Sequence, residues 1–338
     1  MLNFYLGVNV KIVFTSVNKS DIEFYKYSLP ESEVIFFQDN IDNINIKEIC
    51  DANILSVFVF DKLDKNKLSQ FNNLKLIITR SAGVDHIDIN YCKERGIRVA
   101  NIPAYSPKSI AEHSLCLLLN LTRKIKLISS KTKDIDFSQN EELIGLDLDQ
   151  LKIGIIGTGK IGSWMAKICK NLGMEVYAYD IKENLELKTL GIKYINLESL
   201  IEISDVISLH VPYSAKTHHL INKEKINKMK DGAIIINTSR GAVLDTNALY
   251  NALMNGKLGG AGIDVFEDED ILILNRYEKG IVSDKALKIL KLNTLPNVII
   301  TPHIAYFTKK AVNNIRNSVV ECINIFLKEG KLGKFEVV

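Results

Sequence analysis

The sequence has little of what marks secreted, zinc-binding or membrane-spanning proteins. Its five cysteines are scattered, odd in number and without a C-x-x-C pair, which favours reduced thiols over a disulfide framework or a zinc site. The start, MLNFYLGVNVKIVF, lacks the basic segment and the small-residue cleavage site of a signal peptide. No apolar run approaches the length of a membrane span. We therefore expect a cytoplasmic, soluble protein without a membrane partner.

The sequence also has no block of basic or acidic residues. Its formal net charge is only +3 over 338 residues, and Lys and Glu are interspersed, so nothing favours a nucleic-acid partner. Arginine is rare among the 43 basic residues, so an arginine within a motif is less likely to be there by chance. A chain of this length exceeds what one hydrophobic core usually supports, which predicts two domains.

Short β-branched runs alternate with polar, helix-like stretches from Lys11 onward. This alternation predicts βαβ units, parallel sheets and an α/β fold. Two long helices are expected, an apolar one at roughly 108–127 and an amphipathic one at 308–328 that returns to the first domain. The first nine or so residues precede the first strand and are expected to form an extension. The expected strands are Lys11–Thr15, Val34–Phe37, Leu55–Phe60, Leu76–Thr79, Arg98–Asn101, Lys152–Ile156, Val176–Tyr179, Val206–Leu209, Ala233–Asn237, Gly260–Asp264 and Asn297–Ile300.

The stretch from residue 151 to 180 predicts a dinucleotide-binding unit, because a strand runs into GTGKIG and a helix and a second strand follow. Gly157 would make the tight turn, Gly159 would let the backbone approach a pyrophosphate, and Gly162 would let helix and strand pack closely. The phosphates would lie at the helix N-terminus. Asp180 follows Gly162 by 18 residues and could bond a ribose 2′-OH. Its carboxylate would repel a 2′-phosphate, so NAD is favoured over NADP.

Polar residues follow each later strand at its carboxyl end, where open α/β sheets bind ligands. Three of them, Arg240, Glu269 and His303, suit hydride transfer between a nicotinamide and a 2-oxo acid. A guanidinium can hold the carboxylate of the acid and polarise its carbonyl. A histidine can give a proton to the nascent alkoxide near neutral pH. A carboxylate beside the histidine would orient it and raise its pKa.

Each of these residues also has a simpler interpretation. Arg240 could be a surface salt-bridge partner, and His303 a satisfied polar group in a turn. Glu269 lies in an acidic run, where it could be solvated or bind a cation. The contiguous pair His218 and His219 lies in a polar turn and is expected at the surface rather than around a metal ion. We therefore predict no metal site.

Five motifs, in this order, resemble those of the D-isomer-specific 2-hydroxyacid dehydrogenase family: GTGKIG, LHVP, NTSRGAVLD, GIDVFEDE and TPHIAYFT. With RSAGVDHID and PAYSP included, the likeness extends over nearly the whole chain from about Lys11. It implies an NAD-binding Rossmann domain with a doubly wound parallel sheet at 104–303. It also implies a smaller, flavodoxin-like α/β substrate domain made from both chain ends, 1–103 and 304–338. The same resemblance, with the apolar helix from Lys108, implies a homodimer.

The resemblance also implies roles for individual residues. Arg240 would bind and polarise the substrate, and Glu269 would be the partner of His303, the general acid. Glu269 matches rather than Glu267 because it lies five residues after Asp264. The positions that match substrate contacts are Ala82, Gly83, Tyr105, Arg240 and His303. The positions that match cofactor contacts are Gly157, Gly159, Lys160, Ile161, Gly162, Asp180, Val211, Pro212, Thr217, Thr238, Ser239, Arg240 and Asp264.

The implied reaction is the reduction of a small 2-oxo acid by NADH. Within the family the chain looks most like the D-lactate dehydrogenases, because Asp270 follows Glu269 in place of the Pro common in the phosphoglycerate branch. Pyruvate is then the expected substrate. A 2-hydroxyisocaproate dehydrogenase and a hydroxypyruvate or glyoxylate reductase are alternatives, since one methylene is worth only about 1–3 kcal/mol in a pocket. A non-catalytic NAD-sensing protein, similar to the corepressors of this family, is a rival from another class.

Overall fold

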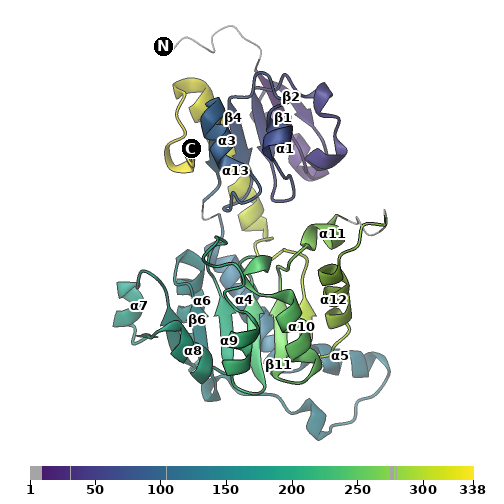
Figure 1. Cartoon of the computed structure of the whole chain (residues 1–338), viewed down its shortest axis with the longest axis vertical. Coiled ribbons are helices and arrows are strands. Elements are labelled where there is room, and N and C mark those ends of the chain that lie inside the picture. Colours follow the sequence, from purple (N-terminus) through teal and green to yellow (C-terminus); the bar gives the residue numbers. More distant parts are fainter. Residues whose placement is uncertain (1–9, 31, 104, 275–277, 279) are drawn as a thin grey trace. The chain divides into compact units, whose positions relative to one another are not determined.

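The computed structural model describes residues 10–338 apart from residues 31, 104, 275–277 and 279. The chain forms two compact units, which Figure 1 shows with their elements labelled. One unit comprises Met1–Ser106 and Thr308–Val338, and the other comprises Pro107–Phe307. The expected boundaries, after residues 103 and 303, fall a few residues earlier in the chain. The expected N-terminal extension lies outside the described residues.

The first unit contains a five-stranded parallel sheet in the order β2-β1-β3-β4-β5, which is the flavodoxin-like order. Its register aligns Val13, Leu55, Ile77 and Val99 in one row, and all four belong to one hydrophobic core. Both faces of such a sheet are covered, and every residue of the inner strands β3 and β4 is buried. The strands are β1 (Lys11–Phe14), β2 (Glu33–Phe36), β3 (Ile54–Val57), β4 (Leu76–Thr79) and β5 (Arg98–Asn101).

The helices of the first unit are α1 (Lys19–Ser28), α2 (Lys65–Leu68), α3 (Ile89–Arg95) and α13 (Lys309–Glu329). Helix α13 comes from the far end of the chain and packs on α1, as the amphipathic pattern predicted. Thr308 caps its N-terminus by accepting a hydrogen bond from Ala311 N, and Gly330 ends it in the left-handed conformation. Its buried face repeats at helical spacing: Ala311, Ile315, Val319, Cys322, Ile323 and Phe326.

The second unit contains a seven-stranded parallel sheet in the order β12-β11-β10-β9-β6-β7-β8. Chain order reverses between β6 and β9, so the switch point of a doubly wound Rossmann sheet lies there. The expected α/β fold class, with one Rossmann and one flavodoxin-like unit, is confirmed. The two-residue strand β8 was not expected. The strands are β6 (Lys152–Ile156), β7 (Glu175–Tyr179), β8 (Lys193–Tyr194), β9 (Val206–Leu209), β10 (Ala233–Asn237), β11 (Leu258–Ile263) and β12 (Val298–Ile300).

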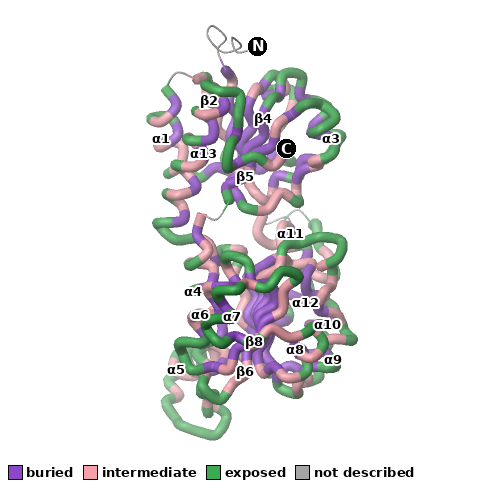
Figure 2. The backbone as a smooth tube through the Cα atoms, turned by 90° about the vertical axis from the view of Figure 1, so that its left-hand side faces the viewer, coloured by how far each residue is buried: buried purple, intermediate pink, exposed green. Residues whose placement is uncertain are grey.

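Helices cover both faces of this second sheet. Along β10, Ile235 belongs to one hydrophobic core, and Ile234 and Ile236 belong to another. Helices α8, α9, α10 and α12 contribute to the first of these cores, and α4 and α6 to the second. Figure 2 shows the buried strands in purple at the centre of the unit. The helices are α4 (Pro107–Thr122), α5 (Ile125–Lys133), α6 (Lys160–Asn171), α7 (Leu185–Thr189), α8 (Leu197–Ile203), α9 (Lys223–Lys228), α10 (Thr246–Met254), α11 (Glu269–Ile273) and α12 (Asp284–Asn293).

The single helix expected at 108–127 is wrong, because two helices, α4 and α5, occupy this stretch. Lys124 has φ 52°, a left-handed conformation that ends α4 and starts α5 in a new direction. The carbonyl of Thr122 accepts its hydrogen bond from Leu146 N rather than from within a longer helix. The Lys126 ammonium donates to the carbonyls of Asn293, Leu295 and Val298 at 2.6–2.9 Å, which anchors the first turn of α5.

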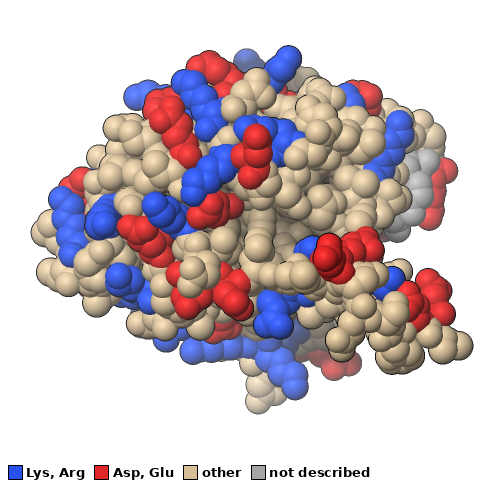
Figure 3. All heavy atoms as spheres, turned by 90° about the horizontal axis from the view of Figure 1, so that it is seen from below, with Lys and Arg blue, Asp and Glu red and all other residues tan. Residues whose placement is uncertain are grey.

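Surface composition agrees with the even distribution of charge along the sequence. On the face shown in Figure 3, basic and acidic side chains are interspersed. Among the described residues, no helix combines the length and the apolar character that a membrane span requires.

Candidate active site

The predicted cofactor and catalytic residues of the second unit lie at one edge of its sheet. All seven strands are parallel, so their carboxyl ends meet at that edge. Each of six strands is followed there, directly or within a few residues, by a predicted site residue: Gly157 after β6, Asp180 after β7, Val211 after β9, Thr238 after β10, Asp264 after β11 and His303 after β12.

The three glycines after β6 have the geometry that a bound pyrophosphate requires. Gly157 has φ 91°, and a Cβ there would lie 2.7 Å from the carbonyl oxygen of His210. A Cβ on Gly162 would lie 1.9 Å from the carbonyl oxygen of Gly157, so only glycine lets α6 approach the strand this closely. A Cβ on Gly159 would meet nothing within 4 Å. The backbone at the N-terminus of α6 is therefore open to an anion.

Asp180 closes this loop from the end of β7. Its Oδ2 accepts hydrogen bonds from Thr158 N at 2.6 Å and from Thr158 Oγ1 at 3.2 Å, and its Oδ1 accepts one from Lys182 N at 3.0 Å. Each carboxylate oxygen has two lone pairs, so acceptor capacity remains for a ribose hydroxyl. The loop and its carboxylate thus fit an adenosine ribose and the adjoining phosphates.

The other predicted cofactor residues surround this loop. Lys160 and Ile161 begin α6. In the loop after β9, Thr217 Oγ1 donates to the carbonyl of Pro212 at 2.7 Å, next to Val211. After β10, Thr238 and Ser239 are buried, Thr238 Oγ1 lies 2.8 Å from Ser114 Oγ of α4, and both Ser239 N and Oγ donate to Asn237 Oδ1. These bonds fix the backbone that leads to Arg240.

His303 and Glu269 form a hydrogen-bonded pair at the same edge. His303 Nδ1 donates to Glu269 Oε1 at 2.7 Å, and Glu269 Oε2 accepts from Phe266 N at 3.1 Å. The side chains are 17% and 19% exposed, so water is mostly excluded while the imidazole stays reachable. Burial lowers the pKa of His303, but the Glu269 carboxylate raises it by more, and the net pKa lies above the usual value. The Glu269 carboxylate therefore favours the protonated form of this histidine.

Asp264 holds the backbone that carries His303. This carboxylate is only 1% exposed, and it accepts hydrogen bonds from Ile304 N and Ala305 N at 2.9 Å and from Thr301 Oγ1 at 2.5 Å. His303 itself has φ 55°, and its N–H donates to the carbonyl of Asp264 at 2.8 Å. The left-handed turn that directs His303 toward Glu269 is therefore held by a buried charge.

Arg240 leaves the end of β10 beside this pair. Its positive charge lowers the pKa of His303, so its guanidinium lies within electrostatic reach of the imidazole. Its Nη1 donates to the carbonyl of Ser239 at 2.8 Å, and its own carbonyl accepts from Asn237 Nδ2 at 3.1 Å. A guanidinium, an imidazole and the carboxylate partner of that imidazole thus belong to one unit.

The other predicted substrate residues, Ala82, Gly83 and Tyr105, belong to the first unit. Ala82 and Gly83 follow β4, and their carbonyls accept hydrogen bonds from Asn101 Nδ2 at 2.6 Å and from Ser81 Oγ at 2.7 Å. With the carbonyls held in this way, the loop has a defined backbone after the strand. Tyr105 follows β5, and its carbonyl accepts from Asn314 Nδ2 of α13 at 2.9 Å.

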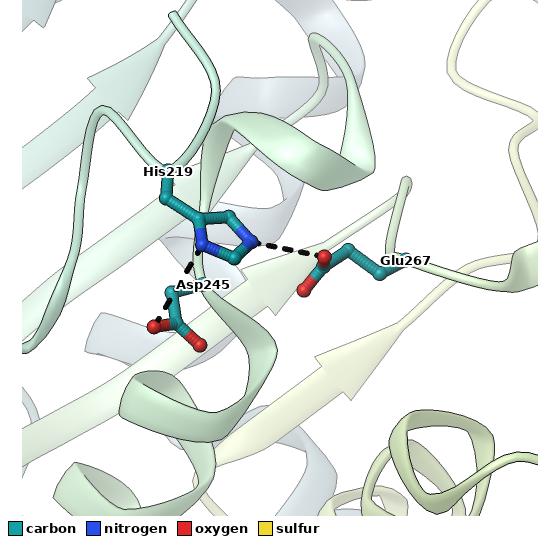
Figure 4. Close-up of side chains that lie close together, drawn as sticks. All are labelled: His219, Asp245 and Glu267. Carbon is teal, nitrogen blue, oxygen red and sulfur yellow. Dashed lines mark hydrogen bonds and ion pairs between the residues drawn. The ribbon is translucent and has the colours of Figure 1, made fainter.

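One cluster of ionisable side chains was not predicted from the sequence. Figure 4 shows the His219 ring between Asp245 and Glu267, with Nε2 at 3.0 Å from Glu267 Oε1 and Nδ1 at 3.9 Å from Asp245 Oδ2. The His219 side chain is 28% exposed and lies against two carboxylates, so it is not the plain surface residue that the sequence predicted. Burial raises the pKa of Glu267, but hydrogen bonds from Lys285, His219 and Thr246 outweigh it and hold the pKa at about 2.

Comparison with known proteins agrees with this geometry. Residues 115–305 match the family described as D-isomer specific 2-hydroxyacid dehydrogenase, NAD binding domain. A 2-hydroxyacid dehydrogenase homolog from Haemophilus influenzae is 36% identical over 315 residues, which cover 92% of this chain and 90% of the relative. An aromatic 2-oxoacid reductase from Clostridium sporogenes is 40% identical over 264 residues, which cover 77% of this chain and 78% of the relative.

A solved structure extends the likeness over both units. The crystal structure of a D-lactate dehydrogenase from Aquifex aeolicus, complexed with NAD and lactic acid, matches with a TM-score of 0.94 and 46% sequence identity. The match covers 97% of this chain and 99% of that one. The chain therefore belongs to the D-isomer-specific 2-hydroxyacid dehydrogenase family and is an NAD-dependent oxidoreductase.

Proposed function

We propose that this protein is a D-lactate dehydrogenase that reduces pyruvate to D-lactate with NADH. The hydrogen-bonded pair of His303 and Glu269, within electrostatic reach of Arg240, carries the proposal. Pyruvate is favoured among 2-oxo acids because the Aquifex aeolicus structure, 46% identical over nearly the whole chain, is described as a D-lactate dehydrogenase complexed with lactic acid.

Arg240 would bind and polarise the substrate. A planar guanidinium can hold a carboxylate through two parallel hydrogen bonds, which a lysine cannot reproduce. Its charge also stabilises the negative charge that develops on the carbonyl oxygen. Because the buried residues Thr238 and Ser239 fix the end of β10, the arginine backbone needs little reorganisation when substrate binds.

His303 would supply the proton. NADH, when bound, supplies the hydride to the carbonyl carbon. The Nδ1–H of His303 is held by Glu269, which leaves Nε2 to donate its proton to the substrate oxygen. Glu269 would favour the protonated imidazole and stabilise its charge, because it raises the His303 pKa. In the reverse direction, the neutral imidazole would accept the proton of the hydroxyl group.

Each unit has its own part in this proposal. The second unit, which contains the matched NAD-binding residues 115–305, would hold the cofactor together with the catalytic residues. The first unit would be the substrate domain made from both chain ends. Within it, the backbone at Ala82 and Gly83 would bind the substrate carboxylate, and Tyr105 would contact the substrate.

A larger substrate is the second candidate. The Clostridium sporogenes relative, 40% identical over 264 residues, is described as an aromatic 2-oxoacid reductase. Phenylpyruvate therefore has to be compared directly with pyruvate.

NADH oxidation against pyruvate, 2-oxobutyrate, 2-oxoisocaproate, phenylpyruvate, hydroxypyruvate and glyoxylate tests the proposal. We expect the highest kcat/KM with pyruvate and D-lactate as the product. A higher kcat/KM with phenylpyruvate or 2-oxoisocaproate would move the assignment to an aromatic or branched-chain reductase. Binding of NADH without turnover of any of these acids would favour an NAD-sensing role.

We also propose a homodimer formed through the second unit. The segment from α4 to residue 146 exposes six large apolar side chains: Leu119, Ile125, Ile135, Phe137, Ile144 and Leu146. A hydrogen bond from Leu146 N to Thr122 O joins the end of this segment to the end of α4. Sedimentation equilibrium should show a dimer that Phe137→Asp weakens, whereas Leu185→Asp on α7 should leave the mass unchanged. A monomeric wild type would contradict this proposal.

A further inference from the structure

Two glutamates near the start of α11 have different surroundings: Glu267 lies in the loop after β11, and Glu269 is the first residue of the helix. Glu269 meets His303, whereas Glu267 meets a separate group of side chains and backbone. Asp268, between them, has φ 58°, so the backbone turns sharply at this residue. The contacts of Glu267 therefore act on the loop two residues before the proposed partner of the general acid.

Glu267 is held more tightly than an ordinary surface carboxylate. Its side chain is 5% exposed. Its Oε1 accepts from His219 Nε2 at 3.0 Å and from Lys285 Nζ at 2.5 Å, and its Oε2 accepts from Thr246 N at 3.0 Å. These partners come from the loop after β9, from α12 and from the N-terminus of α10. A buried carboxylate with this set of donors anchors its own loop to three other elements.

The His219 contact links Glu267 to the loop between β9 and α9. The His219 ring stacks on His218 with the ring centroids 4.0 Å apart, and the His218 ring meets Tyr213 edge-on at 5.9 Å. The backbone N–H of His219 donates to the carbonyl of Ala242 at 2.8 Å. One side of the Glu267 anchor is thus the loop after β9, in which the predicted cofactor residue Thr217 is held separately by its own bond to the Pro212 carbonyl.

A bound metal ion is a poorer interpretation of this cluster. His219, Asp245 and Glu267 have ligand-type atoms within 4.8 Å of one another. However, the imidazole lies between the two carboxylates, and the Lys285 ammonium already bonds the Glu267 oxygen that would face a cation. The Lys285 ammonium already offsets the charge of Glu267, which suits a structural anchor better than a metal site.

We propose that Glu267 is a positioning residue for the general acid. Held by His219, Lys285 and Thr246 N, it fixes the loop so that Glu269 stays in hydrogen-bond contact with His303. This inference rests on the proposed function, since it gives Glu269 its role as partner of His303. Loss of the anchor would loosen Glu269 and thereby lower the pKa of His303, while the cofactor loop at Gly157–Gly162 would be unaffected.

Two variants and one control test the inference. Glu267→Ala removes all three contacts, and Glu267→Gln keeps the size and an acceptor for Thr246 N if the alanine variant does not fold. Asp268→Asn removes one negative charge from the exposed neighbour, and asparagine tolerates the left-handed backbone. The readouts are kcat, KM, the Kd of NADH from energy transfer out of Trp164, and the His303 pKa by NMR. The chain has one Trp and six His, and the His303 signal is identified by its loss in His303→Ala.

We expect Glu267→Ala to lower the His303 pKa by about 1 unit and kcat by between about 10-fold and 100-fold. Glu267→Gln should change both in the same direction but less, and Asp268→Asn should match the wild type. The Kd of NADH should stay within about twofold of the wild-type value in every variant. The inference would be overturned if folded Glu267→Ala or Glu267→Gln had the same His303 pKa and the same kcat as Asp268→Asn. Failure of the proposed function would give a different result: the wild type would show no turnover, or the His303→Ala enzyme would stay active. In either case the NMR titration still measures whether Glu267 affects the His303 pKa.

Discussion

Nδ1 of His303 and Oε1 of Glu269 are 2.7 Å apart, although His303 follows β12 and Glu269 begins α11, 34 residues earlier in the chain. The contact orients the imidazole and stabilises its charge. His303→Ala should therefore lower kcat by about 10²-fold to 10⁴-fold, the usual contribution of general acid–base catalysis. Binding of NADH should survive, and Trp164 fluorescence would report it. An unchanged kcat would refute the role of His303.

The raised pKa of His303 predicts a pH dependence. Reduction needs the imidazolium, so kcat/KM for the 2-oxo acid should be constant below the His303 pKa and should fall as pH rises through it. Glu269→Gln should move this fall to lower pH by about 1 unit, because the imidazolium loses its carboxylate partner. Arg240, which lowers this pKa, and Asp264, which raises it, remain in place. Measurements of kcat/KM for the wild type and Glu269→Gln from about pH 5 to 9 test this. A fall in kcat/KM at the same pH in both enzymes would contradict the prediction.

Arg240→Lys should separate substrate binding from cofactor binding. Lysine keeps the charge but loses the two-pronged hydrogen bond to a carboxylate. We expect kcat/KM for pyruvate to fall by about 10-fold to 100-fold, since a hydrogen bond to a charged group is worth about 1.5–3 kcal/mol. Arg240 also matches a cofactor contact, but lysine keeps the positive charge there, so the Kd of NADH should change less than kcat/KM for pyruvate. Arg123→Lys, at an exposed arginine of the same unit, is the matched control.

Two glycines of one loop should respond differently to alanine. A Cβ at Gly162 would lie 1.9 Å from the carbonyl of Gly157, so Gly162→Ala should destabilise the unit by about 1–3 kcal/mol or more. A Cβ at Gly159 meets no protein atom within 4 Å, so Gly159→Ala should keep the wild-type Tm and weaken NADH binding instead. Thermal unfolding and NADH titration of both variants test this. If Gly159→Ala lowered the Tm as much as Gly162→Ala, Gly159 would be required for folding rather than for cofactor binding.

Asp180 should set the preference for NADH over NADPH. Its carboxylate accepts from Thr158 N and Lys182 N, and it would repel a 2′-phosphate at the ribose. Asp180→Ser should weaken NADH binding by about 10-fold, since one hydrogen bond to a charged group is lost, and should raise the relative kcat/KM for NADPH. Parallel kinetics with the two cofactors measure the ratio. A ratio equal to that of the wild type would assign the preference to other residues.

Much of the fold follows from local sequence patterns. The strand β10 is buried on both faces, and its residues Ala233–Ile236 form an unbroken apolar run, so the sequence predicts it well. The two-residue strand β8 is too short for any period to appear in the sequence. The break between α4 and α5 was also missed, because it depends on Leu146 and on the carbonyls that bind Lys126, all distant in the sequence.

Two carboxylates show where sequence reasoning stops. Glu267 and Glu269 lie in one acidic run, and their local sequence does not reveal their different partners. The left-handed turn at Asp268 and a histidine 48 residues earlier in the chain bring Glu267 into its buried cluster. The pair of histidines at 218–219 is the sequence feature that could have indicated this cluster. The polar turn around the pair led instead to the prediction that both histidines lie at the surface.

The sequence by itself determined the α/β class, the alternation of strands and helices, the glycine loop and the residue types suited to hydride transfer. These features depend on short-range periodicity and on backbone conformations that few residues can adopt. The resemblance implied Glu269 as the partner of His303, but only the tertiary structure showed how closely these side chains meet and that Glu267 meets His219. Such contacts join residues far apart in the chain and depend on the packing of several elements at once, so no local pattern encodes them.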